Sequence, residues 1–249
     1  MNAEVYMMPD CPCIGQGVVH SVFTHTANLM LITSSNRMLT IMQSRFPRVP
    51  DSIRVPGEWW GCYMVGEPFT LGDDRLTVGT WSVVLERRYD WTGRISPGIG
   101  MLQTEYIAQL LKISEQVGCG LLSLPPHFQA RVKDALCSDG AERYVGLGQG
   151  LTPSYDDALV GVMAVKRLLG KRIPFVLTPT VWNQTTEISA RYLRLAQKGY
   201  FGELIWNLAY ALCGKGDVID AIGQLLQIGA TSGRDILFGM AQALHTEQD

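Results

Sequence analysis

The sequence predicts an α+β fold, with a β-rich N-terminal part (a sandwich or a small barrel) followed by an all-α helical C-terminal part. Short β-branched or apolar runs fill residues 17–94, and apolar side chains recur at helical spacing from residue 99 onward. Hydrophobic residues make up 47% of the 249, which is enough to build a buried core. We therefore expect two domains, residues 1–95 and residues 96–249.

Eight short runs in the first part have the length and composition of β-strands. Polar turns at Ser34–Asn36 and Gly72–Asp74 predict hairpins. No helix-length period interrupts the series, which is typical of a sandwich or a small barrel. The expected strands are Val18–Phe23, Leu29–Thr33, Met38–Gln43, Ser52–Val55, Tyr63–Val65, Phe69–Leu71, Arg75–Val78 and Trp81–Glu86.

The second part contains about seven segments with apolar residues three and four positions apart, the spacing of an amphipathic helix. Gly118 and Gly170 end two of them, and Pro125-Pro126 breaks the chain before another. The short connections indicate a compact bundle. The expected helices are Met101–Val117, Phe128–Cys137, Asp157–Leu169, Thr185–Gln197, Gly202–Cys213, Val218–Ile228 and Asp235–Leu244.

Composition excludes several classes of protein. The 21 basic and 23 acidic residues give a net charge of −2, so no basic field is present to bind nucleic acid. No apolar run approaches the length of about 20 residues that spans a bilayer, and the N-terminus has no signal-peptide pattern. The six scattered cysteines indicate reduced thiols, so we expect a cytoplasmic protein. Cys11 and Cys13 are too close for a zinc knuckle, and we expect neither a metal nor a cofactor.

Common catalytic motifs are missing from the sequence. It contains no nucleotide phosphate-binding loop, no H-E-x-x-H zinc motif and no G-x-S-x-G elbow. The four histidines are dispersed. His20 and Ser21 are neighbours in an expected strand, where successive side chains point to opposite faces, so we do not expect them to pair. His20 is a candidate catalytic residue, with a structural histidine as the alternative interpretation.

One segment has strong chemical character, and it reads Gly148-Gln149-Gly150-Leu151-Thr152-Pro153-Ser154-Tyr155-Asp156-Asp157. Its glycines permit unusual backbone angles and close approach of a ligand. Two hydroxyl residues and two carboxylates follow, and then a helix is expected to begin. Free N–H groups at such a helix start bind anions. The segment therefore predicts a small-anion site.

A shorter copy of this pattern occurs at Gly229–Gly239. Both copies read S-x-x-D before an apolar run, an arrangement that also caps helices without any ligand. Capping therefore remains an alternative explanation of both motifs. If the two copies build one site, their serines are expected to lie close together. The aligned pairs are Ser154 with Ser232, Asp157 with Asp235, Leu159 with Leu237 and Gly161 with Gly239.

Adjacent carboxylates on a helix lie about 100° apart, so Asp156 and Asp157 are not expected to face the same way. If Asp157 turns back to cap its helix, Asp156 is left to reach a substrate amine, an arginine or a magnesium ion. Asp156 is therefore the second candidate catalytic residue. A solvated carboxylate is the alternative.

The Gly148–Asp157 segment resembles the G-x-G-P-G-L-T-P-S-G-D-D signature of a bacterial family that includes the AllH-type subunit of oxamate carbamoyltransferase, from allantoin (purine) degradation. Gln149 and Tyr155 depart from that signature, and the tyrosine is expected to place a phenol at the mouth of the site. The resemblance covers about residues 17–244. Three further segments agree with the family pattern: Val19–Phe23 with Ala27–Leu29, Pro50–Ile53 and Gly229–Asp235.

The resemblance implies a complex of several protein subunits in which carbamoyl phosphate and oxamate interconvert with oxalurate and phosphate. Small anions of this kind suit helix N-termini that follow glycines. Arg234 is expected to neutralise a carboxylate, and Asp156 to orient an amide. A non-catalytic scaffold subunit, a stand-alone anion-binding protein and a hydrolase using Asp156 remain alternatives. The expected substrate-binding residues are Gly148, Gly150, Thr152, Ser154, Asp157, Ser232, Arg234 and Asp235.

Overall fold

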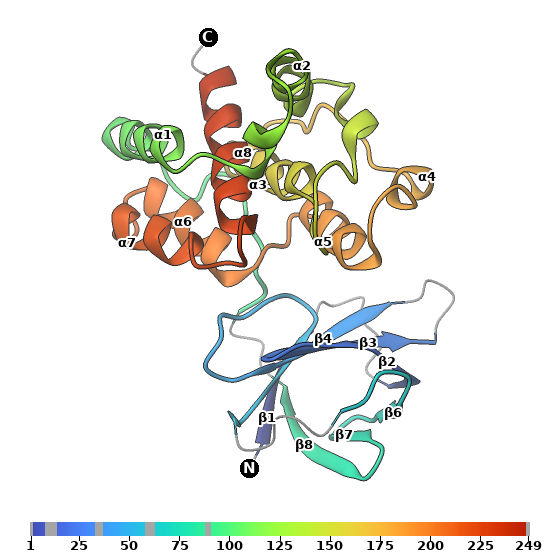
Figure 1. The fold of residues 1–249 in the computed structure, drawn as a ribbon. Coiled ribbons are helices and arrows are strands. Elements are labelled where there is room, and N and C mark those ends of the chain that lie inside the picture. Colours follow the sequence, from blue (N-terminus) through green and yellow to red (C-terminus); the bar gives the residue numbers. More distant parts are fainter. Residues whose placement is uncertain (1, 8–13, 33–36, 58–62, 88–90, 248–249) are drawn as a thin grey trace. The chain divides into compact units, whose positions relative to one another are not determined.

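A computed structural model describes residues 2–7, 14–32, 37–57, 63–87 and 91–247. The chain divides into two compact units, Met1–Gly93 and Arg94–Asp249. The first unit is a β-barrel and the second is helical (Figure 1). The predicted fold class, a β-rich part followed by an all-α part, is therefore confirmed.

The eight strands of the first unit close into a barrel in the order β1-β5-β4-β3-β2-β6-β7-β8. The pairs β1/β8 and β4/β5 are parallel, and the other neighbours are antiparallel. Closure leaves no free sheet edge. The strands are β1 (Asn2–Tyr6), β2 (Gly15–Val22), β3 (Thr26–Leu31), β4 (Met38–Gln43), β5 (Ser52–Val55), β6 (Pro68–Leu71), β7 (Arg75–Val78) and β8 (Trp81–Arg87).

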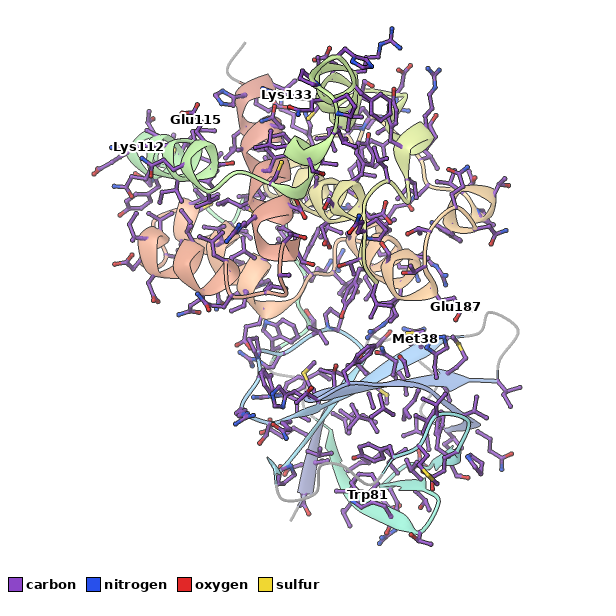
Figure 2. The ribbon with its side chains drawn as sticks, viewed as in Figure 1. Met38, Trp81, Lys112, Glu115, Lys133 and Glu187 are labelled. Carbon is purple, nitrogen blue, oxygen red and sulfur yellow. The ribbon has the colours of Figure 1, made fainter. Side chains whose placement is uncertain are left out.

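Two strand predictions are wrong. β1 was not expected, because its five residues carry a weak pattern and its place depends on pairing with β5 and β8, which are distant in sequence. Tyr63–Val65 is not a strand. Instead, Tyr63 meets the edge of the Trp81 ring, with 5.1 Å between ring centroids, and Trp81 lies within the barrel unit (Figure 2). The predicted turn at Ser34–Asn36 lies outside the described residues.

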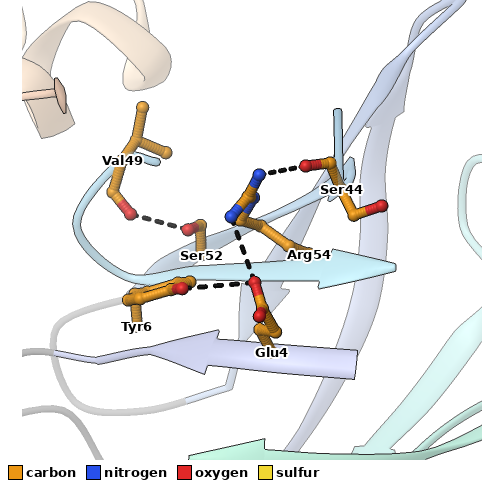
Figure 3. A network of polar contacts seen from close by, with 6 residues as sticks. All are labelled: Glu4, Tyr6, Ser44, Val49, Ser52 and Arg54. Atoms are coloured by element: carbon orange, nitrogen blue, oxygen red, sulfur yellow. Dashed lines mark hydrogen bonds and ion pairs between the residues drawn. The ribbon is translucent and has the colours of Figure 1, made fainter. Parts of the chain in front are cut away.

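Polar side chains join β1 to β5 in the closed barrel (Figure 3). The guanidinium of Arg54 donates to Glu4 at 3.0 Å and to the carbonyl of Ser44. The Tyr6 hydroxyl donates to the same Glu4 carboxylate at 3.2 Å. The strand pairing that the sequence did not predict is thus reinforced by side chains as well as by the backbone.

The second unit contains α-helices around one apolar core. Charged residues such as Lys112, Glu115 and Lys133 project from its surface (Figure 2). All seven expected helices are present, and the short α4 is an addition. The helices are α1 (Thr104–Val117), α2 (Pro126–Leu136), α3 (Ser154–Leu168), α4 (Pro179–Trp182), α5 (Glu187–Gln197), α6 (Glu203–Leu212), α7 (Val218–Leu225) and α8 (Ser232–Thr246).

Helices α3 and α8 cross at the centre of this unit with their backbones in direct contact (Figure 1). A Cβ atom on Gly161 would overlap the carbonyl oxygen of Ile236, and one on Gly239 would overlap the carbonyl oxygen of Ala158. In the sequence alignment of the two motifs, Gly161 corresponds to Gly239 and Ala158 to Ile236. The two contacts are therefore equivalent, and the repeat folds into a pair of helices related by approximate two-fold symmetry.

Within the described ranges, no helix is long and apolar enough to cross a membrane. The cysteines that the structure describes, Cys119, Cys137 and Cys213, are free thiols. The Cys11–Cys13 segment lies outside the described residues.

Candidate functional site

The two S-x-x-D motifs lie together at the crossing of α3 and α8. The helices begin at Ser154 and at Ser232, close to where the motifs predict. The hydroxyl oxygens of Thr152 and Ser232 are 3.0 Å apart, so residues of both motifs are in direct contact. The prediction that the two motifs lie close in space is confirmed.

The alternative explanation by helix capping is wrong. The residue before α3 is Pro153 and the residue before α8 is Thr231, and neither forms a side-chain capping hydrogen bond. The serines are already the first helical residues, so the carboxylates three positions later lie beyond the capping position. Asp157 and Asp235 therefore do not complete a capping box at their own helix starts.

Instead, each aspartate hydrogen-bonds to a serine of the opposite helix and to a threonine just ahead of its own helix. Hydroxyl groups of Ser232 and Thr152 hydrogen-bond to Asp157, and those of Ser154 and Thr231 hydrogen-bond to Asp235. The two serine–aspartate hydrogen bonds between the helices obey the two-fold relation, because Ser154 and Ser232 are equivalent positions. Asp235 additionally accepts the main-chain N–H of Gly120 at 2.6 Å.

Burial dominates the electrostatics of this pair. Asp157 is 6% exposed and Asp235 is fully buried. In the described part of the chain, one oxygen of each carboxylate has no hydrogen-bond partner. Loss of hydration disfavours the charged form, so burial raises the pKa of Asp157 to about 7 and also raises the pKa of Asp235. The nearby Asp235 carboxylate adds to the rise at Asp157, and the hydroxyl donors oppose it.

Asp156 was expected to face a ligand or solvent, but its carboxylate is buried and bound by protein donors. It is 1% exposed, and both of its oxygens accept hydrogen bonds from protein donors. The N–H of Gly146 donates to Oδ1 at 2.8 Å, and the hydroxyls of Thr185 and Ser189 donate to Oδ2 at 2.5 and 2.6 Å. Burial raises the pKa of Asp156 and these three donors oppose the rise. The carboxylate thus ties the glycine turn to the start of α5.

The turn at residues 146–152 is fixed at both ends and exposed in the middle. Gly146 is held by Asp156, and the Leu151 carbonyl accepts the hydroxyl of Thr186. Residues 148–151 are exposed. Within the described residues, the N–H groups of 148–152 donate to no other main-chain group. The backbone therefore presents donors on a loop whose ends are already ordered.

The three glycines of this turn have different requirements. Gly146, Gly148 and Gly150 all have positive φ, at 86°, 127° and 92°. A Cβ on Gly146 or Gly148 would strike the backbone of Gln184 or Ser154, so packing requires glycine at both positions. A Cβ on Gly150 would meet nothing within 4 Å. Packing alone does not require glycine at 150, although its backbone angle favours it.

The remaining site candidates on α3 and α8 lie as follows. Arg234 is exposed in the first turn of α8, where its charge lowers the pKa of Asp235 against the larger effect of burial. Tyr155 is fully buried and its ring meets that of Tyr144 edge-on, with centroids 5.6 Å apart. The expectation that Tyr155 places a phenol at the mouth of the site is wrong, because its side chain belongs to the core.

His20 and Ser21 lie in β2 of the barrel, and they are in contact. His20 Nδ1 and Ser21 Oγ are 3.2 Å apart. The expectation that they point apart is wrong, because the register with β3 shifts between Val19 and Ser21. Such a bulge adds one residue to a strand and breaks the alternation of side chains.

Sequence reasoning missed the donors that come from elsewhere in the chain. Gly120 belongs to a Gly-Cys-Gly run that was interpreted only as a helix stop, yet a Cβ there would overlap the Ser154 hydroxyl. Thr185 and Ser189 surround Asp156 from a segment 30 residues later. The sequence features that could have indicated these donors are Gly120, which follows the predicted helix end, and the hydroxyl residues Thr185 and Ser189 at the start of a predicted helix. Across the described ranges, no three His, Cys, Asp or Glu side chains gather as a metal site would require.

The raised pKa of Asp157 predicts how stability depends on pH. Its folded value of about 7 lies above the value near 3.9 of an unfolded aspartate. Its stabilising contribution is therefore complete below about pH 4 and is lost as the pH rises through 7. We expect Asp157→Asn to be more stable than the native chain at pH 8, by at most about 4 kcal/mol, since one pKa unit corresponds to about 1.4 kcal/mol. Urea unfolding at pH 8 and pH 4 measures the effect, and a difference that did not shrink toward pH 4 would contradict it.

Comparison with known proteins identifies the family. Residues 144–244, which include both S-x-x-D motifs, match the family described as oxamate carbamoyltransferase subunit AllH. Residues 5–89, which include all of the barrel but the first three residues of β1, match the AllH family N-terminal domain. No solved structure matches this chain. The two family matches cover most of the sequence, and the chain belongs to the AllH family of oxamate carbamoyltransferase subunits.

Proposed function

We propose that this chain is a substrate-binding subunit of a carbamoyltransferase complex that exchanges a carbamoyl group between carbamoyl phosphate and oxamate, in allantoin catabolism. The observation that supports it best is the turn at 146–152, whose ends are fixed and whose exposed residues 148–151 have N–H groups that donate to no main-chain acceptor among the described residues. Preordering of the ends lowers the entropy lost when a ligand binds. The phosphate of carbamoyl phosphate is the expected ligand of these donors.

The carboxylates of Asp157 and Asp235 disfavour an anion at the N-termini of α3 and α8, so the 146–152 turn is the better binding place. Asp157 and Asp235 already occupy the first turns of α3 and α8, where a free anion would otherwise be stabilised by the helix dipole. The exposed residues 148–151 lie ahead of these carboxylates in the chain. Arg234 is the exposed cation in the first turn of α8. We therefore assign the phosphate to the main-chain N–H groups of the turn.

The carboxylates take separate roles in this proposal. Asp156 is a positioning residue, because its oxygens are occupied by Gly146, Thr185 and Ser189 and it holds the turn in place. Asp157 and Asp235 orient the hydroxyl groups of Ser232 and Ser154. Carbamoyl transfer requires orientation of the two substrates and stabilisation of the departing phosphate, which fixed main-chain donors supply.

Gly150→Ala tests the anion site against a matched control. Gly98 also has positive φ, at 75°, and also has open space at its Cβ position, so Gly98→Ala carries a similar backbone strain. We expect Gly150→Ala to weaken carbamoyl phosphate binding by about tenfold or more, which is about 1.4 kcal/mol, while Gly98→Ala binds as the native chain does. Both variants are expected to lose similar stability.

Titration calorimetry with phosphate and carbamoyl phosphate, together with thermal melting, measures these quantities. Equal affinities for the native chain and both variants would contradict the proposed site. If the native chain binds neither ligand, alone or with its partner subunits, the scaffold interpretation replaces the proposal.

A further inference from the structure

A chain of polar side chains crosses three strands of the barrel, apart from the helical site. The Thr40 hydroxyl donates to Asn28 Oδ1 at 3.0 Å, and Asn28 Nδ2 donates to Ser21 Oγ at 3.0 Å. Ser21 Oγ in turn lies 3.2 Å from His20 Nδ1. In the histidine tautomer whose Nδ1 carries no proton, the Ser21 hydroxyl donates to Nδ1 while it accepts from Asn28.

The register of the strands explains why these side chains meet. Ser21 pairs with Asn28 across β2 and β3, and Asn28 pairs with Thr40 across β3 and β4. The bulge at Val19/Ser21 brings His20 to the same side as Ser21. Bulges are frequent next to active sites, where they redirect a side chain.

Two of the three segments that agree with the family pattern contribute to this polar chain. His20, Ser21 and Asn28 belong to the first, which joins Val19–Phe23 with Ala27–Leu29. The second, Pro50–Ile53, contains Asp51, whose carbonyl accepts the N–H of Thr40 at 3.1 Å. The proposed anion site in the helical unit uses none of these residues.

We propose that Ser21 is a nucleophile that takes a carbamoyl or similar small acyl group from an activated donor, with His20 as the base that receives its proton. A serine in hydrogen-bond reach of a histidine is the arrangement that activates a hydroxyl for attack on a carbonyl carbon. Both side chains are only partly buried, so a small donor can reach them. Asn28 and Thr40 are positioning residues that fix the direction of the Ser21 hydroxyl.

The step balances with carbamoyl phosphate as the donor, an identity that rests on the proposed function; the donor molecule that Ser21 attacks is bound in the barrel unit and not at the 146–152 turn. Ser21 Oγ forms a bond to the carbamoyl carbon, and the bond from that carbon to the phosphate oxygen breaks. The hydroxyl proton moves to His20 Nδ1 and then to the departing phosphate, which leaves as hydrogen phosphate. An incoming amide nitrogen, such as that of oxamate, then displaces Ser21 Oγ from the carbamoyl carbon, and its proton returns to the serine.

Covalent labelling of the full chain tests the proposal. The chain is incubated with carbamoyl phosphate and, separately, with phenylmethanesulfonyl fluoride, and the modified peptide is located by mass spectrometry. We expect one added group on Ser21, none there in Ser21→Ala, and labelling slowed about 100-fold or more in His20→Asn, as loss of a general base implies. Ser82→Ala and His25→Asn, which alter a serine and a histidine outside the polar chain, are expected to label as the native protein does.

Absence of a Ser21 adduct from both reagents in the folded chain would overturn the inference, as would an equal labelling rate in His20→Asn. Full turnover by a complex containing Ser21→Ala would also overturn it. That result leaves the proposed function standing, because phosphate binding at the 146–152 turn is measured separately through Gly150→Ala. Loss of turnover in Ser21→Ala with phosphate binding retained supports both.

Discussion

Gly161→Ala is expected to lower the free energy of unfolding of the helical unit by about 3 kcal/mol or more, at or beyond the upper end of ordinary overpacking effects. The added methyl group would overlap the carbonyl oxygen of Ile236 and crowd the N–H of Met240. Both obstacles are backbone atoms of α8, so no side-chain rotation relieves them, and the two central helices must move apart. Gly239→Ala, at the equivalent position, is expected to have a similar effect, because its methyl group would meet the backbone of Ala158.

Gly223→Ala provides the control. Gly223 lies inside α7, and a Cβ there would meet nothing within 4 Å. Alanine in an open helical position is expected to stabilise the chain by about 0.5–1 kcal/mol. Urea unfolding followed by circular dichroism measures the three variants. A gain in stability for Gly161→Ala like that for Gly223→Ala would show that α3 and α8 are not in backbone contact.

Asp156→Ala is expected to cost about 3 kcal/mol or more, because each buried donor left without a partner costs about 1–3 kcal/mol. Three donors depend on this carboxylate: the N–H of Gly146 and the hydroxyls of Thr185 and Ser189. Removing it frees the glycine turn from α5, so ligand binding is expected to fall together with stability.

Asp134→Ala is the matched control, because Asp134 is an exposed carboxylate on α2. Its loss is expected to change stability by less than about 0.5 kcal/mol. Thermal melting and urea unfolding of both variants measure the difference. An Asp156→Ala variant with native stability and no activity would instead assign Asp156 to the chemistry, as the sequence alone suggested.

The order of strands and helices followed from periodicity, because alternating and helical spacings are local properties of the chain. The strand β1 did not, since it is specified by partners about 50 and 80 residues away. Barrel closure, with its parallel pairs β1/β8 and β4/β5, is likewise a long-range property. The repeat of serine, aspartate and glycine did predict that the two motifs lie close together, because two copies of one pattern suggested a shared site.

The roles of the two adjacent aspartates were reversed in the sequence interpretation. Helix geometry correctly separated Asp156 from Asp157, but it did not show which one finds donors. That depended on Thr185 and Ser189, which approach only after α5 has packed. The contact of His20 with Ser21 was missed for a similar reason, since a bulge inserted by pairing with β3 is invisible in a strict two-residue period.

Amide chemical shifts during a phosphate titration test the central claim most directly. The ¹⁵N-labelled chain is titrated with inorganic phosphate and then with carbamoyl phosphate. We expect saturable shifts of the Gly148, Gly150 and Leu151 amides, with smaller changes elsewhere and with the Gly98 amide unaffected. Saturable shifts confined to other regions, or none at these three amides at any phosphate concentration, would contradict it.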